Sequence, residues 1–194
     1  MTDLPNRVRV AIIGGGAVGA SCLYHLAKAG WTDCILLEKN ELTSGSTWHA
    51  AGNVPTFSVN WAIMNMQRYS ADLYRRLGDE VGYPMNYHVT GSVRLAHGEE
   101  RMKEFRHVVA MGQAQGMELN ILGLSEMKAL YPFLETHELL GALHDPCDGD
   151  IDPAQLTQAL AKGARDMGAR IERFCPVVGA VRDGADWVLQ TEIG

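Results

Sequence analysis

The hydrophobic positions of the chain change their spacing along the sequence, and each spacing predicts an element. Residues 8–13 and 34–37 are apolar runs of the kind found in buried parallel strands. Between them lies a predicted helix, which Gly30 ends at the C-cap position. Its apolar positions recur at helical spacing and are Val18, Cys22, Leu23, Leu26 and Ala29. These elements predict a β-α-β start to a parallel sheet.

The later elements follow the same two patterns. Helical spacing predicts a helix over 63–77 with Gly78 as its stop, and places Met64 and Met66 in the core. A further helix should begin at Pro153 after an Asp152 cap and end at Gly168, with a buried face of Leu156, Leu160, Ala164 and Met167. The remaining predictions are helices over 99–115 and 125–131, the second closed by Pro132, and strands over 91–96, 118–122, 139–144, 170–174, 177–181 and 187–191.

This order of elements predicts an α/β fold, in which a Rossmann-like nucleotide-binding domain is interrupted by a mixed α+β substrate domain. The β-α-β unit and the loop after it should occupy residues 1–80, and the substrate domain should start over 81–145. Residues 146–194 should return to the nucleotide-binding domain, with 170–174 joining the parallel sheet and the last two strands starting a meander.

The glycines after the first strand indicate a dinucleotide site. Gly14, Gly16 and Gly19 fit the pattern G-x-G-x-x-G, in which the first turns the chain, the second admits a pyrophosphate and the third lets the helix pack. Glu38 ends the second strand 19 residues after Gly19, close to the offset of about 20 residues for an acid that binds a ribose hydroxyl. A carboxylate here, rather than an arginine, favours FAD or NAD over NADP.

A glycine-rich loop over residues 45–52 follows, and it is nearly uncharged. Its small residues allow backbone N–H groups to approach an anionic or electron-rich ligand, while Trp48 and His49 supply bulk and polar hydrogens. Taken alone, the loop favours a structural interpretation, in which two aromatic residues close over a core. Its place shortly after a dinucleotide start favours an imidazole beside a flavin ring.

Composition and charge exclude several classes of protein. A net charge of −6 leaves no basic stripe for nucleic acid, and no segment approaches the roughly 20 apolar residues of a membrane span. Seven residues before the first strand are too few for a signal peptide, so we expect a reducing cytoplasm. The four cysteines form no C-x-x-C pair and the histidines show no ligand spacing, so no metal is assigned. The three aspartates of residues 145–150 lack the final glutamate of a calcium loop and predict a tight turn instead.

Four runs of the chain resemble the dimethylglycine and sarcosine dehydrogenase family, within the D-amino-acid-oxidase-like FAD oxidoreductases. They are residues 11–19, 36–39, 42–52 and 148–153. Many FAD proteins share the first two runs, whereas the third is specific. Residues 91–96 are more similar to the dimethylglycine branch of the family.

The resemblance implies that His49 is joined through a ring nitrogen to the 8α-methyl group of FAD, and that it tethers and tunes the flavin. It also implies that Val178 holds the adenine side through its backbone. Asn53 is a departure, because the family has an apolar residue at that place. The FAD-binding residues expected from the motifs and the resemblance together are Gly14, Gly16, Ala17, Val18, Gly19, Glu38, Lys39, Gly45, Ser46, Thr47, Trp48, His49, Ala50, Ala51, Gly52, Asn53 and Val178.

The activity implied by the resemblance is hydride transfer from an N-methyl carbon of dimethylglycine or sarcosine to flavin N5. The resulting iminium is hydrolysed or passed to tetrahydrofolate, and the electrons go to oxygen or to a carrier flavoprotein. Family members continue beyond residue 194, so we expect a truncated chain whose substrate-binding and folate-binding residues lie elsewhere. The alternatives are a non-catalytic FAD-binding fragment or subunit, and an NAD-dependent dehydrogenase, which leaves residues 45–52 unexplained.

Overall fold

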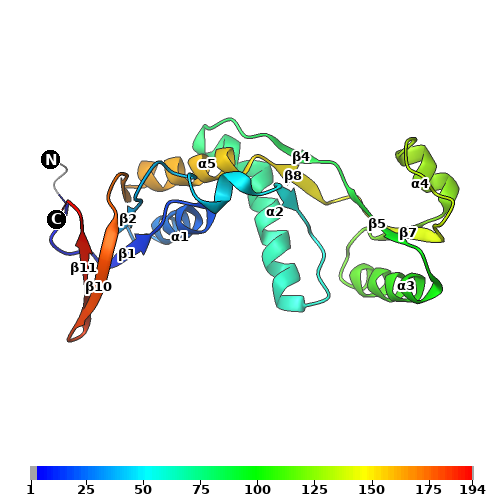
Figure 1. The fold of residues 1–194 in the computed structure, drawn as a ribbon, viewed down its shortest axis with the longest axis horizontal. Helices are drawn as coiled ribbons and strands as arrows, with labels where there is room; N and C mark the ends of the chain where they lie inside the picture. Colours follow the sequence, from blue (N-terminus) through cyan, green and yellow to red (C-terminus); the bar gives the residue numbers. More distant parts are fainter. Residues whose placement is uncertain (1–3, 194) are drawn as a thin grey trace. The chain divides into compact units, whose positions relative to one another are not determined.

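The computed structural model describes residues 4–193, which form two compact units (Figure 1). The first unit takes the chain up to residue 52, residues 74–86, and the chain from residue 151 onward. The second takes residues 53–73 and 87–150. The predicted functional domains over 1–80, 81–145 and 146–194 stay a prediction, and their residues 1–3 and 194 lie outside the described part.

The first unit is built on a parallel sheet of three strands. These are β1 (Val10–Ile13), β2 (Cys34–Leu37) and β9 (Arg170–Glu172), in the order β1-β2-β9. All four residues of β2, the middle strand, are buried, which explains its unbroken apolar sequence. The predicted β-α-β start and the return of the chain to this sheet near residue 170 are therefore confirmed.

Helices α1 (Ala17–Lys28) and α5 (Pro153–Asp166) pack together beside this sheet. The predicted cap is present, because the Asp152 carboxylate accepts hydrogen bonds from the N–H groups of Ala154 and Gln155 at 2.8 and 3.0 Å. The predicted buried face of α1 is partly wrong. Val18 is 86% exposed and Cys22 is also exposed, because α1 turns a different face inward, made of Ala20, Leu23, Tyr24 and Ala27.

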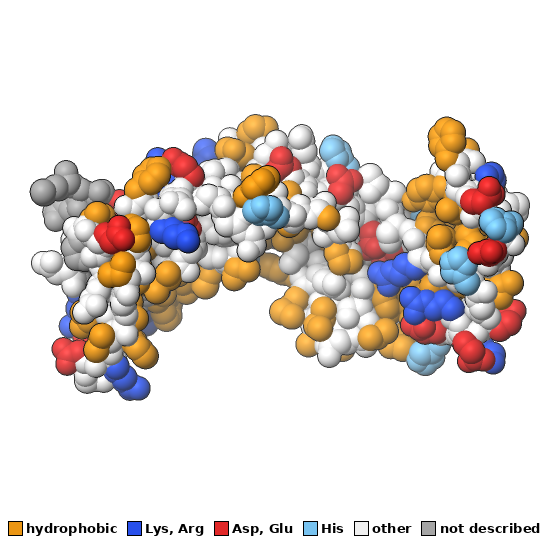
Figure 2. Space-filling model, viewed as in Figure 1, with side chains coloured by type: hydrophobic (Ala, Val, Ile, Leu, Met, Phe, Trp, Pro, Cys, Tyr) orange, Lys and Arg blue, Asp and Glu red, His pale blue; other side chains and the backbone are white. Residues whose placement is uncertain are grey.

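Strands β10 (Val177–Asp183) and β11 (Asp186–Thr191) form an antiparallel hairpin in the first unit. Hydrophobic side chains line this hairpin in the view of Figure 2. Exposed hydrophobic residues of the two strands include Val181 and Trp187. The pairing slips between Val177 and Gly179, so Val178 has no partner residue in β11.

Helix α2 (Trp61–Val81) is longer than its predicted span of 63–77. Gly78 does not end it, because this glycine makes room for the chain that returns beyond the helix. A Cβ atom at Gly78 would lie 3.0 Å from the carbonyl oxygen of Tyr83. The residue after Val81 that leaves the helical conformation is Gly82, with φ +59°. Met64 is buried as predicted, whereas Met66 is 61% exposed.

The second unit contains an antiparallel sheet of β5 (Ser92–Ala96), β7 (Gly141–Asp145) and β6 (Asn120–Leu122), in that order. Helix α3 (Glu99–Gln113) covers this sheet, and α4 (Leu124–Leu130) lies between β6 and β7 in the chain. Its core is made by Phe57, Met64, Phe105, Leu119 and Leu143, among others. Each predicted strand of this sheet is present within two residues of its predicted limits: β5 (Ser92–Ala96), β6 (Asn120–Leu122) and β7 (Gly141–Asp145). A further small sheet, β3 (Asn53–Val54), β8 (Gly149–Ile151) and β4 (Tyr87–Val89), was not predicted.

Candidate functional site

The carboxyl ends of β1 and β2 bring the glycine turn and Glu38 together. Gly14 has φ +107° and donates its N–H to the carbonyl oxygen of Leu37 at 2.9 Å, so the chain turns where the motif predicts. A Cβ atom at Gly19 would lie 2.0 Å from the Gly14 carbonyl oxygen. Only glycine therefore allows α1 to start this close to the turn, at the sheet edge where α/β folds bind ligands.

Glu38 has a structural contact that its spacing from Gly19 did not reveal. Its side chain is buried, with Oε2 accepting the Gly15 N–H at 2.6 Å and Oε1 accepting the Asn40 N–H at 2.8 Å. The carboxylate thus joins the glycine turn to the end of β2. An ionised carboxylate has about four acceptor positions, so two remain for ribose hydroxyls. The neighbouring Lys39 is exposed.

The start of α1 offers backbone donors to an anion. Its N-cap residue is Gly16, which provides no side-chain cap, and its first turn contains no acid. The positive end of the helix dipole and its N–H groups are therefore free of carboxylate partners from the helix itself. One donor is used: the Ala17 N–H bonds to Thr47 Oγ1 at 3.0 Å. This contact places the loop over residues 45–52 beside the glycine turn.

Residues Ser46–His49 form a short 3₁₀ turn, η1, within this loop. The Ala50 N–H donates to the Thr47 carbonyl oxygen at 3.1 Å and so closes the turn. The ring centroids of Trp48 and His49 lie 3.9 Å apart. The Nδ1 atom of His49 is 3.2 Å from the Gly45 carbonyl oxygen. Because a carbonyl oxygen only accepts hydrogen bonds, this contact requires a proton on Nδ1, and a neutral ring then has its lone pair on Nε2.

The rest of the predicted loop is placed by one glycine. Gly52 has φ +79°, and a Cβ atom there would lie 2.1 Å from the carbonyl oxygen of Ile151. The residues before it, Ala50 and Ala51, are exposed. Asn53 is the first residue of β3 and belongs to the second unit. The fold of the first unit therefore does not place Asn53 beside the other predicted FAD-binding residues.

The residues at this site fit a dinucleotide that carries an aromatic ring system. Ile13, Val18 and Trp48 are apolar but 58%, 86% and 60% exposed, and they flank the α1 N-terminus or belong to the loop beside it. Apolar side chains, backbone N–H donors and a carboxylate are the groups that a ring system, a pyrophosphate and a ribose require. Val178 has no partner residue in the β10–β11 pairing.

A second group of carboxylates lies in the second unit, where a neighbouring threonine of the same unit donates hydrogen bonds to both. Asp145 and Asp148 are both buried, and the Thr56 hydroxyl donates to Asp145 at 2.9 Å while the Thr56 N–H donates to Asp148 at 2.6 Å. Burial, and then the charge of Asp148, raise the pKa of Asp145. The predicted tight turn is confirmed at residues 146–147. No group of three or more potential metal ligands occurs among residues 4–193.

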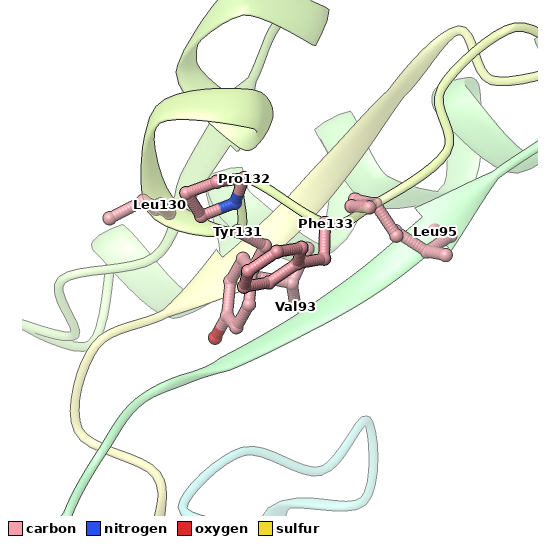
Figure 3. A pocket seen from close by; sticks show the side chains of 7 residues that line it. Val93, Leu95, Leu130, Tyr131, Pro132 and Phe133 are labelled. Carbon is pink, nitrogen blue, oxygen red and sulfur yellow. The ribbon is translucent and has the colours of Figure 1, made fainter.

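The second unit also contains a pocket of about 530 Å³ beside β5. Figure 3 shows the rings of Tyr131 and Phe133 beside Val93, with Leu95 farther along the strand. The Tyr131 hydroxyl is the one polar side-chain group in the lining. The pocket therefore suits an apolar group and offers no acid, base or thiol for catalysis.

Within residues 4–193, no helix has the length and apolar character needed to cross a bilayer.

Comparison with known proteins places this arrangement in a family. A sequence model described as "DAO: FAD dependent oxidoreductase" matches residues 9–194. Mitochondrial dimethylglycine dehydrogenase of Rattus norvegicus is 41% identical over 97% of this chain, and mitochondrial sarcosine dehydrogenase of Homo sapiens is 36% identical over 91%. The mitochondrial pyruvate dehydrogenase phosphatase regulatory subunit of Mus musculus is 35% identical over 87%.

The chain is much shorter than these relatives. It spans 22% of the dimethylglycine dehydrogenase and 19% of each of the other two. Among solved structures, L-proline dehydrogenase from P. horikoshii superposes with a TM-score of 0.90 at 26% identity, over 98% of this chain and 50% of that one. The mixed α/β fold predicted from the motifs is thus the fold of this family.

Proposed function

Because this chain belongs to the family of FAD dependent oxidoreductases, we propose that the whole protein oxidises an N-methylated glycine with a flavin bonded to His49. The FAD-binding part of the proposal rests on the family match over residues 9–194. The substrate class rests on identities of 41% and 36% to enzymes named for dimethylglycine and sarcosine. Dimethylglycine is the first substrate to test, because that identity is the higher.

The observation that carries the proposal is the position of His49. Its ring is exposed on η1, and η1 is fastened to the first N–H of α1, where a pyrophosphate would bind. The hydrogen bond from Nδ1 to the Gly45 carbonyl oxygen holds the ring and leaves Nε2 available for a bond to carbon. The Trp48 ring lies beside the imidazole, with the ring centroids 3.9 Å apart and the ring planes tilted by 37°.

Each part of the site has a separate task in this proposal. The N–H groups at the start of α1 bind the phosphates, Glu38 binds ribose, and the backbone at Val178 binds the adenine side. FAD, once bound, supplies the redox chemistry by accepting a hydride from the substrate carbon. His49 fixes the orientation of the ring and withdraws electron density from it, so it acts as a tether and not as a general base. The groups that bind the amino acid are expected elsewhere in the whole protein, as are any folate site and the contact with an electron carrier.

A second candidate function is a non-catalytic FAD-binding subunit. The observation that favours it is the 35% identity to a protein named as a regulatory subunit. Such a protein would retain the fold and the dinucleotide turn but need not oxidise any substrate.

Anaerobic mixing of the full-length protein with candidate substrates tests the two functions against each other. The enzyme hypothesis predicts that dimethylglycine or sarcosine bleaches the flavin absorbance while unmethylated glycine does so much less. A yellow protein that no N-methylated amino acid bleaches would support the subunit instead. A protein that binds no flavin would contradict both.

A further inference from the structure

The segment that carries His49 is fastened to the dinucleotide turn at two places. The Thr43 N–H donates to the Gly15 carbonyl oxygen at 3.0 Å, and the Ala17 N–H donates to Thr47 Oγ1 at 3.0 Å. The second bond is the one made by a side chain. It joins residues 30 positions apart and lies two residues from His49.

Thr47 is also the inward-facing residue of η1. It is half-buried, whereas Ser46, Trp48 and His49 are exposed. Its carbonyl oxygen accepts the Ala50 N–H that closes the turn, so one residue holds both the anchor and the turn. Without the anchor, no other side-chain hydrogen bond among the described residues joins η1 to α1.

Gly16 provides the space for this anchor. A Cβ atom at Gly16 would lie 2.8 Å from Thr47 Oγ1, closer than a carbon and an oxygen can approach without displacement. The hydroxyl group uses one lone pair to accept the Ala17 N–H, and its own proton has no acceptor within residues 4–193. The proton therefore stays available to an anionic ligand while the anchor is intact.

We propose that Thr47 is a positioning residue, whose hydroxyl group holds η1 on the start of α1 and so sets the place of the His49 ring. This role rests on the proposed function, because the position of the ring matters only if a flavin binds at the glycine turn. The residue acts through His49 and is not itself catalytic.

The test compares Thr47→Val, Thr47→Ser and the wild type in the full-length protein. Thr47→Val keeps the shape of the side chain but removes the hydroxyl group, and Thr47→Ser restores it. Thr32→Val is a matched control, since it makes the same change at an exposed threonine of the first unit. Amide hydrogen exchange of the peptide over residues 44–52 is measured without cofactor. The fraction of flavin that stays with acid-precipitated protein is then followed in time after FAD is added.

In Thr47→Val, exchange over residues 44–52 and at Ala17 should be about fivefold faster, as expected for the loss of one hydrogen bond, and attachment of flavin should slow by a similar factor. Thr47→Ser and Thr32→Val should match the wild type in both measurements. If Thr47→Val does not fold, the exchange measurement is made on Gly16→Ala instead, because its added carbon displaces the hydroxyl group and should produce the same faster exchange.

If amide exchange over residues 44–52 is as slow in Thr47→Val as in the wild type, the proposed anchor is wrong. The anchor is also wrong if the wild type bonds its flavin and Thr47→Val does so at the same rate. If the wild type bonds no flavin, the attachment at His49 has failed, and the exchange measurement alone decides the role of Thr47.

Discussion

Helix α1 of the first unit and helix α3 of the second both begin after a glycine, yet only the first has the surroundings of an anion site. Gly16 and Gly98 are both extended N-cap residues without a side-chain cap. The first turn of α3 contains Glu99 and Glu100, which complement the helix dipole and would repel an anion. The first turn of α1 has no acid, and a neutral hydroxyl group from Thr47 meets its first N–H.

The comparison shows that a glycine before a helix does not by itself define a dinucleotide site. The charge of the first turn and the segment folded over it decide what the helix start can bind. Over α3, Figure 2 shows acidic and basic side chains interspersed, and Lys103 pairs with Glu100 at 2.7 Å. The N-terminus of α3 is therefore already complemented by acidic side chains of the same helix.

Placing a valine before each helix should give the largest difference. Gly16→Val should weaken FAD binding at least about 100-fold, because the branched side chain displaces Thr47 and fills the approach of the pyrophosphate. Gly98→Val is the matched control, since a Cβ atom at Gly98 meets nothing within 4 Å. Flavin titration of both variants checks the prediction. Equal affinities would mean that FAD does not bind at α1.

Glu38→Ala should affect both folding and FAD binding. The structure adds to the role expected from spacing alone, because the side chain accepts two backbone N–H groups. Its loss should lower the free energy of unfolding by about 1–3 kcal/mol, the range for a buried donor left unpaired. Denaturant unfolding of the cofactor-free protein measures this change. An unchanged stability would contradict the role of Glu38 in holding the glycine turn.

Giving α1 the acidic first turn of α3 should have a smaller effect. Val18→Glu should weaken FAD binding about tenfold, because the new carboxylate competes with the phosphates for the helix dipole. Val18 is 86% exposed, so the change should leave the stability of the cofactor-free protein nearly unaltered. Val18→Gln has a similar shape without the charge and should retain most of the affinity. Similar affinities for the two variants would exclude a contribution of first-turn charge.

The smallest predicted effect concerns the buried carboxylates of Asp145 and Asp148 in the second unit. The folded state raises the pKa of Asp145, so it binds more protons than the unfolded chain once the pH exceeds the ordinary aspartate pKa. The contribution of Asp145 to stability should therefore fall as the pH rises from the ordinary pKa through the raised one. Asp145→Asn should flatten this part of the curve, and Glu118→Gln, at an exposed carboxylate of the same unit, should not. Equal pH slopes for the wild type and Asp145→Asn across that window would contradict the assignment.

Local patterns predicted most of the first unit. The apolar runs at β1 and β2, the glycines of the turn and the Asp152 cap act within a few residues, and the structure has all of them. The failures involve distant partners. Gly78 stays inside α2 because of Tyr83, and α1 exposes Val18 because packing selects another face.

The contacts of the candidate site show the same division. The motif pointed to Gly14, Gly19 and Glu38, whose spacing is set by one β-α-β unit. The Thr47 anchor crosses 30 residues, and the bond from Thr56 to Asp145 crosses 89. No periodicity in the sequence encodes such pairs, since each depends on how the chain folds back on itself.

Acid denaturation of the full-length protein tests the central claim, that His49 is bonded to the flavin, most directly. The account predicts that the yellow colour stays with the precipitated wild-type protein, and that His49→Ala releases it to the supernatant. The variant should still bind FAD before denaturation, because the glycine turn and the α1 N–H groups do not depend on the bond. Release of all the flavin from the denatured wild-type protein would contradict the claim, and His49 would then be a loop residue beside a non-covalent cofactor.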